Sequence, residues 1–443
     1  MAAPNIRYVR ASGDTTGAVD TANLQAALST TGVKAVVIDG TYYVNTTLNV
    51  TAQSLIGATR SIIQRVGTAS SGYVVNITGG TDTGFIQDIA IKCGNLCRGI
   101  QIYHATYRKI INNVRVESAT GVACDLVDCW GADVDGLLIS SCRGIALRTH
   151  RCNSMYAQNV RIMSHKCFRS TDATEDTDLA TYASENGIAA AAALYNGTGG
   201  YGTYTEDWPA HDDTSVVDSS GATSYVQTPI ADRGMIVIGS AGDDQDLTTF
   251  DNLLMEVGIC ADYPCISIAS FTTIFRNVRF ENGYHYAALV NVRGDGVHQG
   301  ANITFDNVFV TTTHPTPTEF IHCYTDTENV TIRNLAPGTY ITDHIVVLDG
   351  GDHINIAVEN LSTWVAPAAT AIVDLINSAT LTRRTVVYGK LEATGDIVLG
   401  STSAIYLGDS ATDGTWKIVR DGNNLLFQRR ESGSYVSKTT TTP

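Results

Sequence analysis

Basic residues, proline and long apolar runs are all scarce in this sequence. Lys and Arg number 29 against 44 for Asp and Glu, which gives a formal net charge of -15. Phosphates repel such a chain, so we expect neither nucleic acid nor an anionic membrane surface as a partner. There is no run of about 18 apolar residues and no apolar opening segment, which predicts no membrane insertion and no signal peptide.

Cysteine is present ten times, but not in the spacing of a metal site. Cys93 and Cys97 are four residues apart and Cys124 and Cys129 five apart, whereas zinc sites favour a tighter C-x2-C pair with a partner pair or His. A protein made in the cytosol keeps its thiols reduced, so we interpret these residues as core fillers. We expect no metal and no cofactor.

One short pattern recurs along the chain: apolar residues alternate with polar ones around an Asn or its substitute. It reads F-I-Q-D-I-A-I at 85–91, I-I-N-N-V-R-V at 110–116 and I-F-R-N-V-R-F at 274–280. The marker residues are Asp88, Asn113, Gly136, Asn159, Asn252, Asn277, Asn307 and Asn334. They lie 23 to 30 residues apart, except for one gap of 93.

This period predicts a parallel β-helix. Each strand alternates inward apolar and outward polar residues, and only stacked coils bury a continuous core. A second strand follows in each coil, as in G-I-Q-I at 99–102 and G-I-A-L at 144–147. The marker Asn fits a turn in the left-handed conformation and can hydrogen-bond its counterpart on the next coil. We therefore interpret these Asn residues as structural.

The beginning of the chain predicts a cap for the solenoid. Residues 20–29, D-T-A-N-L-Q-A-A-L-S, form a short amphipathic helix with Asp20 or Thr21 as N-cap. Together with A-V-V-I-D-G-T-Y-Y-V and S-L-I-G-A, this opening resembles the N-terminal signature of pectate-lyase-like β-helices and phage tailspikes. The resemblance implies an all-β, right-handed parallel β-helix with a short capping helix, a fold that hosts lyases, hydrolases and binders alike.

The end of the chain predicts a small separate β element. D-G at 413–414 and D-G-N-N at 421–424 mark hairpin turns between alternating strands. This tail resembles the C-terminal elements of phage tail proteins, which implies a homotrimer in the virion tail. The predicted domains are a cap at 1–33, the β-helix at 34–400 with an insertion at 171–232, and the C-terminal element at 401–443. Because the cap begins so early, we expect no virion-attachment domain of the kind that tailspikes usually carry before it.

The 93-residue gap contains the insertion, whose composition is rich in small and aromatic residues. Solenoid insertions emerge on one face, often the binding face. Four of its residues have side chains that stack on sugar rings or bind their hydroxyls: Tyr201, Tyr204, Trp208 and His211. A surface loop that packs its own aromatics, or contacts a neighbouring chain, is the alternative.

Carboxylates mark a candidate catalytic site four residues past the markers. Glu256 and Glu281 follow Asn252 and Asn277 at the same rung of successive coils and point outward. Stacked strands are about 4.8 Å apart, so we expect mutual repulsion to keep a proton on one of the two carboxylates, as an acid–base pair requires. Further candidates lie in the same stretch: Asp243, Asp244 and Asp246 as acids, with Arg279, Tyr284 and His285 as substrate-binding residues. Glu117 and an acidic patch around Trp130, with Asp125, Asp128, Asp133 and Asp135, are weaker candidates; a surface ion pair is the structural alternative for all of them.

Three functions fit this pattern. The first is a depolymerase that binds and hydrolyses a bacterial surface polysaccharide with two carboxylates. The second is a polysaccharide lyase, which needs a Lys or Arg base and usually Ca²⁺ on aspartates. The third is a non-catalytic receptor-binding fibre that uses the same groove.

Overall fold

The computed structural model divides the chain into two compact units, Met1–Tyr388 and Gly389–Pro443. It describes residues 5–51, 53–68, 70, 72–78, 84–164, 214–217, 223–226, 234–239, 245–256, 259–260, 264–281, 284–285, 288–294, 300–311, 319–336, 341, 344–359, 373–377, 380–383, 404–407, 413–421 and 424–441.

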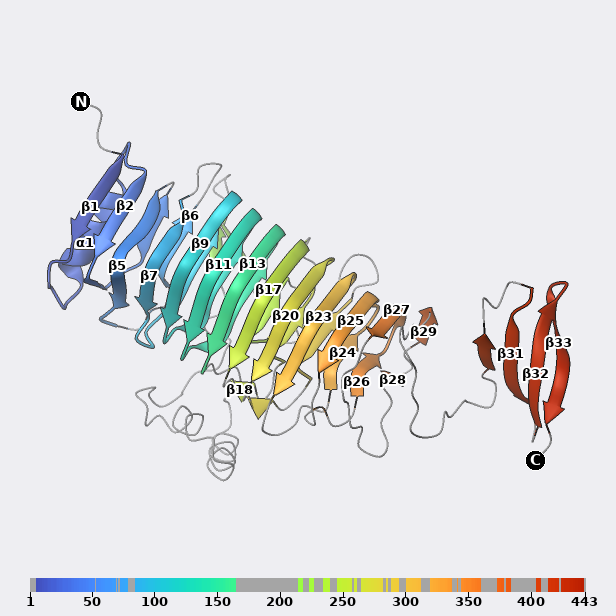
Figure 1. Ribbon diagram of the computed structural model, residues 1–443. Helices are drawn as coiled ribbons and strands as arrows, with labels where there is room; N and C mark the ends of the chain where they lie inside the picture. Colours follow the sequence, from blue (N-terminus) through green and yellow to red (C-terminus); the bar gives the residue numbers. More distant parts are fainter. Residues whose placement is uncertain are drawn as a thin grey trace, which may run out of the picture. The chain divides into compact units, whose positions relative to one another are not determined.

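The first unit is a stack of coils whose strands form two long parallel sheets (Figure 1). The larger sheet, sheet A, contains β1 (Ile6–Arg10), β2 (Ala35–Asp39), β3 (Thr41–Val44), β5 (Ser54–Arg65), β7 (Ile86–Lys92), β9 (Thr106–Glu117), β11 (Trp130–Ser140), β13 (Asn153–Met163), β17 (Asp246–Glu256), β20 (Thr273–Glu281), β23 (Ile303–Thr311), β25 (Glu328–Ala336), β27 (Asp352–Glu359) and β29 (Thr380–Arg383). Sheet B contains β4 (Leu48–Thr51), β6 (Tyr73–Thr78), β8 (Arg98–Tyr103), β10 (Thr120–Val127), β12 (Arg143–His150), β16 (Ile236–Ile238), β19 (Ile266–Ile268), β22 (Val290–Arg293), β24 (Glu319–Tyr324), β26 (His344–Asp349) and β28 (Val373–Ile376).

From β4 on, the chain alternates between the two sheets, so each coil adds one strand to each. This confirms the right-handed parallel β-helix that the repeat and the resemblance predict. Inward residues build one continuous core because every coil places its apolar side chains over those of the coil before. Phe250, Phe275 and Phe305 stack on three successive strands of sheet A, with ring centroids 5.1 and 4.6 Å apart.

All eight markers adopt the left-handed conformation, with φ between 50° and 67°. The marker divides each long strand of sheet A into two arms, and the residues one and three positions past it point into the core. The ladder forms where Asn307 donates to Asn277 (2.6 Å) and Asn252 to Asn159 (2.8 Å). Elsewhere the amide reaches a carboxylate on the preceding coil, as Asn277 does to Asp251 (2.8 Å).

The capping helix α1 (Ala18–Leu28) begins two residues before the predicted range. Its N-cap is Gly17, in the left-handed conformation, and not Asp20 or Thr21. A side chain at Gly17 would lie within 3 Å of the backbone of Val44 and Asn45, so the close approach of the first coil excludes the usual capping residues there. The Asp20 carboxylate is buried and accepts hydrogen bonds from the backbone of Ser12 (2.8 Å) and Tyr43 (3.0 Å), tying the cap to the first coil.

The first unit also contains two small two-stranded sheets, and a separate four-stranded sheet forms the second unit. β14 (Thr214–Val217) and β15 (Thr223–Val226) pair antiparallel within the insertion, and β18 (Ile259–Cys260) pairs parallel with β21 (Tyr284–His285). The second unit is an antiparallel sheet of β30 (Ala404–Leu407), β31 (Trp416–Asp421), β32 (Asn424–Glu431) and β33 (Ser434–Thr441).

The eight cysteines whose side chains the structure describes are all buried, in agreement with their interpretation as core residues. In the described part of the chain, no helix has the length and apolar character needed to cross a bilayer.

Candidate active site on the outer face of sheet A

Two columns of residues, of which only Ser140 is buried, run along the outer side of the second arm of sheet A. The register places Glu117, Ser140, Met163, Glu256, Glu281 and Thr311 in one column. The adjacent column, two residues earlier on each strand, holds Arg115, Leu138, Arg161, Leu254, Arg279 and Phe309. Carboxylates, guanidinium groups and an aromatic ring therefore share one face.

Glu256 and Glu281 are direct neighbours in this register, as the sequence predicts. Each is partly buried and has its own guanidinium partner. Arg161 on β13 donates to Glu256 (2.6 Å), and Arg279 on the same strand as Glu281 pairs with that carboxylate. Each carboxylate of the pair therefore has its own arginine partner. That repulsion keeps a proton on one of the two carboxylates stays a prediction.

The site includes two residues that the carboxylate count missed. Arg161 and Phe309 both lie two positions past a marker, Asn159 and Asn307, where side chains also point outward, so counting two residues past each marker as well as four would have found them. Phe309 is 44% exposed, and the Arg279 guanidinium lies 5.5 Å from its ring centroid. An exposed ring on a strand next to Glu281 offers a surface for the C–H face of a sugar.

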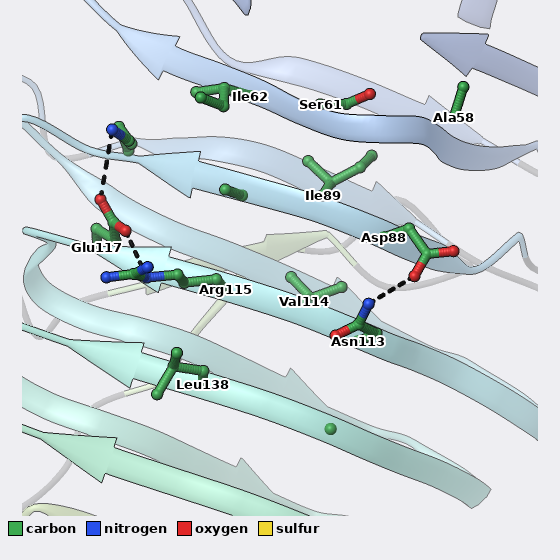
Figure 2. Close-up of a pocket in the computed structure, with 13 residues that line it drawn as sticks. Ala58, Ser61, Ile62, Asp88, Ile89, Asn113, Val114, Arg115, Glu117 and Leu138 are labelled. Carbon is green, nitrogen blue, oxygen red and sulfur yellow. Dashed lines mark hydrogen bonds and ion pairs between the residues drawn. The ribbon is translucent and has the colours of Figure 1, made fainter. Parts of the chain in front are cut away.

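A groove of about 650 Å³ opens on the same face, over β5, β7, β9 and β11 (Figure 2). Glu117 lies at one end, between Lys92 (3.8 Å) and Arg115. Asp88 lies toward the other end, where it accepts a hydrogen bond from Asn113 (2.7 Å). Glu117 is three strands from Glu256 in its column, a distance of about 14 Å at the usual strand spacing.

Asp246 is not brought to this site. It is the first residue of β17, and Glu256 is the last. Ten residues of extended chain separate them, which correspond to about 30 Å. Asp246 is close to Glu256 in sequence, but the residues between them form one long strand. Asp246 therefore cannot act on the same glycosidic bond as Glu256 and Glu281.

The other predicted site residues divide into two groups. Tyr284 and His285 form β21, directly after Glu281, and pair with Ile259 and Cys260; only their backbone is described. The remaining candidates lie outside the described residues: Tyr201, Tyr204, Trp208, His211, Asp243 and Asp244. Ser164, the last residue described on the N-terminal side of the insertion, donates its backbone N–H to the carbonyl of Glu256 (2.9 Å).

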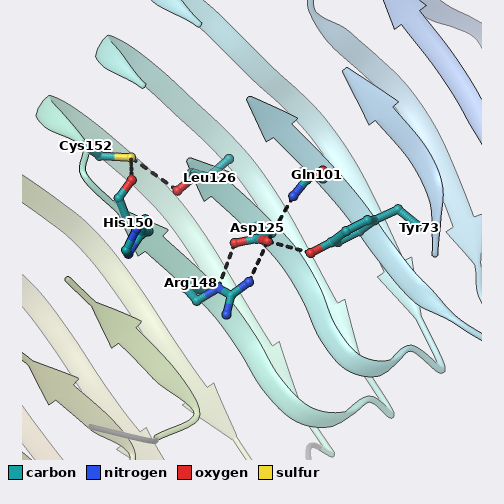
Figure 3. Close-up of polar contacts among 7 residues, drawn as sticks. All are labelled: Tyr73, Gln101, Asp125, Leu126, Arg148, His150 and Cys152. Atoms are coloured by element: carbon teal, nitrogen blue, oxygen red, sulfur yellow. Dashed lines mark hydrogen bonds and ion pairs between the residues drawn. The ribbon is translucent and has the colours of Figure 1, made fainter. Parts of the chain in front are cut away.

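The acidic patch predicted around Trp130 does not form one cluster. Asp125 belongs to sheet B and is fully buried, with a two-pronged ion pair to Arg148 (2.9 and 2.8 Å; Figure 3). Its carboxylate also accepts from the hydroxyl of Tyr73 (2.5 Å). Burial raises the pKa of Asp125, but the Arg148 guanidinium outweighs it and holds the pKa below its ordinary value. Asp133 and Asp135 lie on β11 of sheet A instead.

Sheet B carries a second titratable cluster that the sequence did not indicate. The ring of His322 on β24 contacts Glu319 (2.6 Å) through Nδ1 and Asp349 (3.2 Å) through Nε2. One face of the ring stacks on Tyr324, with centroids 4.1 Å apart. Both ring nitrogens are engaged within the protein, so this cluster suits a structural role. Among the described residues, no group of three or more His, Cys, Asp or Glu has the geometry to hold a metal ion.

No protein-family model matches the chain, and neither does any curated protein. Solved structures with detectable similarity include Geobacillus virus E2 ORF18, at 11% identity and TM-score 0.42, covering 98% of this chain and 76% of that one. They also include the polygalacturonase from Erwinia carotovora (10%, TM-score 0.38, covering 86% and 96%) and the tailspike gp42 of Acinetobacter phage vb_AbaP_AS12 (9%, TM-score 0.32, covering 99% and 80%). The assignment of the parallel β-helix rests on the strand pairing of this chain itself.

Proposed function

We propose that this protein is a tailspike-like depolymerase that binds and hydrolyses a bacterial surface polysaccharide, with Glu256 and Glu281 as its catalytic pair. The observation that carries the proposal is their register. The two carboxylates are neighbours on adjacent strands of an outward face that also presents Arg161, Arg279 and Phe309.

The register favours a retaining mechanism. Side chains at one rung are about 4.8 Å apart at their origin. Retaining glycosidases place their carboxyl groups about 5–5.5 Å apart, whereas inverting enzymes need about 6.5–9.5 Å to admit a water molecule. Adjacent strands therefore suit direct attack of one carboxylate on the anomeric carbon, followed by hydrolysis of the glycosyl–enzyme.

The surroundings suggest the role of each carboxylate. We assign Glu281 as the nucleophile because Arg279 on its own strand holds it beside the exposed ring of Phe309. Glu256 then protonates the leaving oxygen and later activates water. Arg161 reaches Glu256 from a separate strand, so substrate binding can exchange this contact without disturbing β17.

The experiment uses isolated capsule or O-antigen with Glu281→Gln, Glu256→Gln and a control, Glu359→Gln. Glu359 pairs with Arg333 on the adjacent strand (2.9 Å), like Glu256 with Arg161, but its register partner on β25 is that same arginine and not a carboxylate. We expect new reducing ends with the wild type and Glu359→Gln, and at least a hundredfold slower release with the other two variants. Full activity in both site variants would remove this pair. Release of unsaturated uronate would indicate a lyase, and binding without cleavage a receptor-binding fibre.

Assembly as a homotrimer in the virion tail is a separate proposal, supported by the resemblance of residues 404–443 to phage tail elements. In the second unit, Trp416 and Val436 are exposed apolar side chains that neighbouring chains would cover. Light scattering should give three times the chain mass of 47.3 kDa. A monomer mass would contradict trimerisation without affecting the catalytic pair.

A further inference from the structure

The groove beside Glu117 is built into the fold by missing side chains and one irregular strand. Gly136 occupies the marker position of β11, where neighbouring coils carry Asn113 and Asn159, so no amide fills the groove there. β5 shifts register between Ile56 and Ser61, and Ala58 in that bulge lines the groove. A hollow thus replaces the flat surface that regular coils would present.

The two ends of the groove differ in charge. Lys92 and Arg115 flank the single carboxylate of Glu117, and their side chains remain 41% and 51% exposed. At the far end, both oxygens of Asp88 accept from neutral amides, those of Asn113 (2.7 Å) and Gln87 (2.8 Å). Four residues of strand, about 13 Å, separate the two ends along β9. An anionic group is therefore attracted to one end only.

We propose that this groove is a binding subsite for an acidic sugar unit, whose carboxylate binds between Lys92 and Arg115. The floor between the two ends contains Ala90 and Leu138, against which the C–H face of a pyranose ring can pack. This inference rests on the proposed function: the subsite would hold a unit of the polysaccharide about 14 Å from Glu256, along one column of side chains. Remote binding of this kind positions a polymer for cleavage.

Glu117 allows a distinctive test of the proposal, because its carboxylate occupies the position that the carboxylate of the sugar would take. Glu117→Gln frees both cations and should tighten binding of an acidic sugar about threefold, while Lys92→Met and Arg115→Met should weaken it by a similar factor. If these residues had only a structural role, their variants would not change the affinity for the acidic sugar in opposite directions. Lys109→Met is the matched control, since Lys109 is 42% exposed on the same sheet and pairs with Asp135 outside the groove.

The measurement is saturation-transfer NMR on the full chain with methyl glycosides of glucuronate, galacturonate and N-acetylneuraminate, against methyl glucoside and galactoside. At least one acidic glycoside should bind more tightly than the neutral ones and follow the predicted order of the variants. Equal binding of acidic and neutral glycosides, or weaker binding by Glu117→Gln, would overturn the proposal. Because binding is read without cleavage, failure of the subsite and failure of the Glu256 and Glu281 pair are distinguishable.

Discussion

The Arg148 guanidinium donates two hydrogen bonds, 2.9 and 2.8 Å long, to the Asp125 carboxylate on the adjacent strand of sheet B, and both side chains are at most 1% exposed. Removing one partner of such a pair leaves an uncompensated buried charge. We therefore expect Asp125→Asn to lower the free energy of unfolding by about 3–5 kcal/mol, measured by urea denaturation. Asp128→Asn, which breaks the more exposed pair with Arg151, should cost less than about 1 kcal/mol. Equal losses in the two variants would contradict this account.

His322 predicts a pH-dependent contribution to stability. Burial lowers its pKa, but the carboxylates of Glu319 and Asp349 outweigh burial and raise the pKa above the ordinary value of 6.5. A raised pKa stabilises the fold fully below 6.5, and the contribution is lost as the pH rises through the folded-state pKa. His322→Gln should thus lower Tm more at a pH below 6.5 than at alkaline pH. The control is His344→Gln, whose carboxylate contact to Asp374 is longer (3.7 Å). A pH-independent loss in His322→Gln would refute the charged contact.

Substitutions of Asn277 should show which residues the left-handed backbone of the marker position tolerates. Its φ is 55°, and its amide donates to Asp251 and accepts from Asn307. Glycine loses these hydrogen bonds but tolerates the left-handed conformation, whereas alanine loses them and is strained. We expect Asn277→Ala to be less stable than Asn277→Gly by about 1 kcal/mol, and Asn277→Val to be the least stable of the three in thermal denaturation. Equal stability of the three variants would show that only the lost ladder bonds matter and would contradict the role of the left-handed conformation.

The buried cysteine thiols should react slowly with thiol reagents in the folded protein. Burial raises the pKa of Cys142 and Cys323 to about 12, and that of Cys124 rises as well for the same reason. The thiolate is the reactive form, so these three residues should resist a thiol reagent at neutral pH and react once the chain is denatured. Mass spectrometry after pulse labelling identifies each residue. Rapid labelling of Cys142 in the native state would contradict its place in the core.

Much of the fold was readable from the sequence because its unit is local. Coils of 23 to 30 residues repeat Asn and apolar positions, and a period-two strand dictates which side chains face the core. The same rule placed Glu256 and Glu281 together, since one register step follows directly from equal distances to Asn252 and Asn277. The prediction for Asp246 used closeness in sequence and not the position relative to a marker, and it was wrong: Asp246 precedes Glu256 closely in sequence but lies at the other end of the strand.

The sequence by itself determined the winding of the chain, the inward residues, and the outward columns that carry the candidate acids. Only the tertiary structure decided which charges meet. Arg161 reaches Glu256 although the two are 95 positions apart in the sequence, and the bulge in β5 opens a groove over Gly136. Such contacts depend on how coils stack and how each side chain is oriented, and neither is encoded in a local pattern, because the partners belong to different turns of the solenoid.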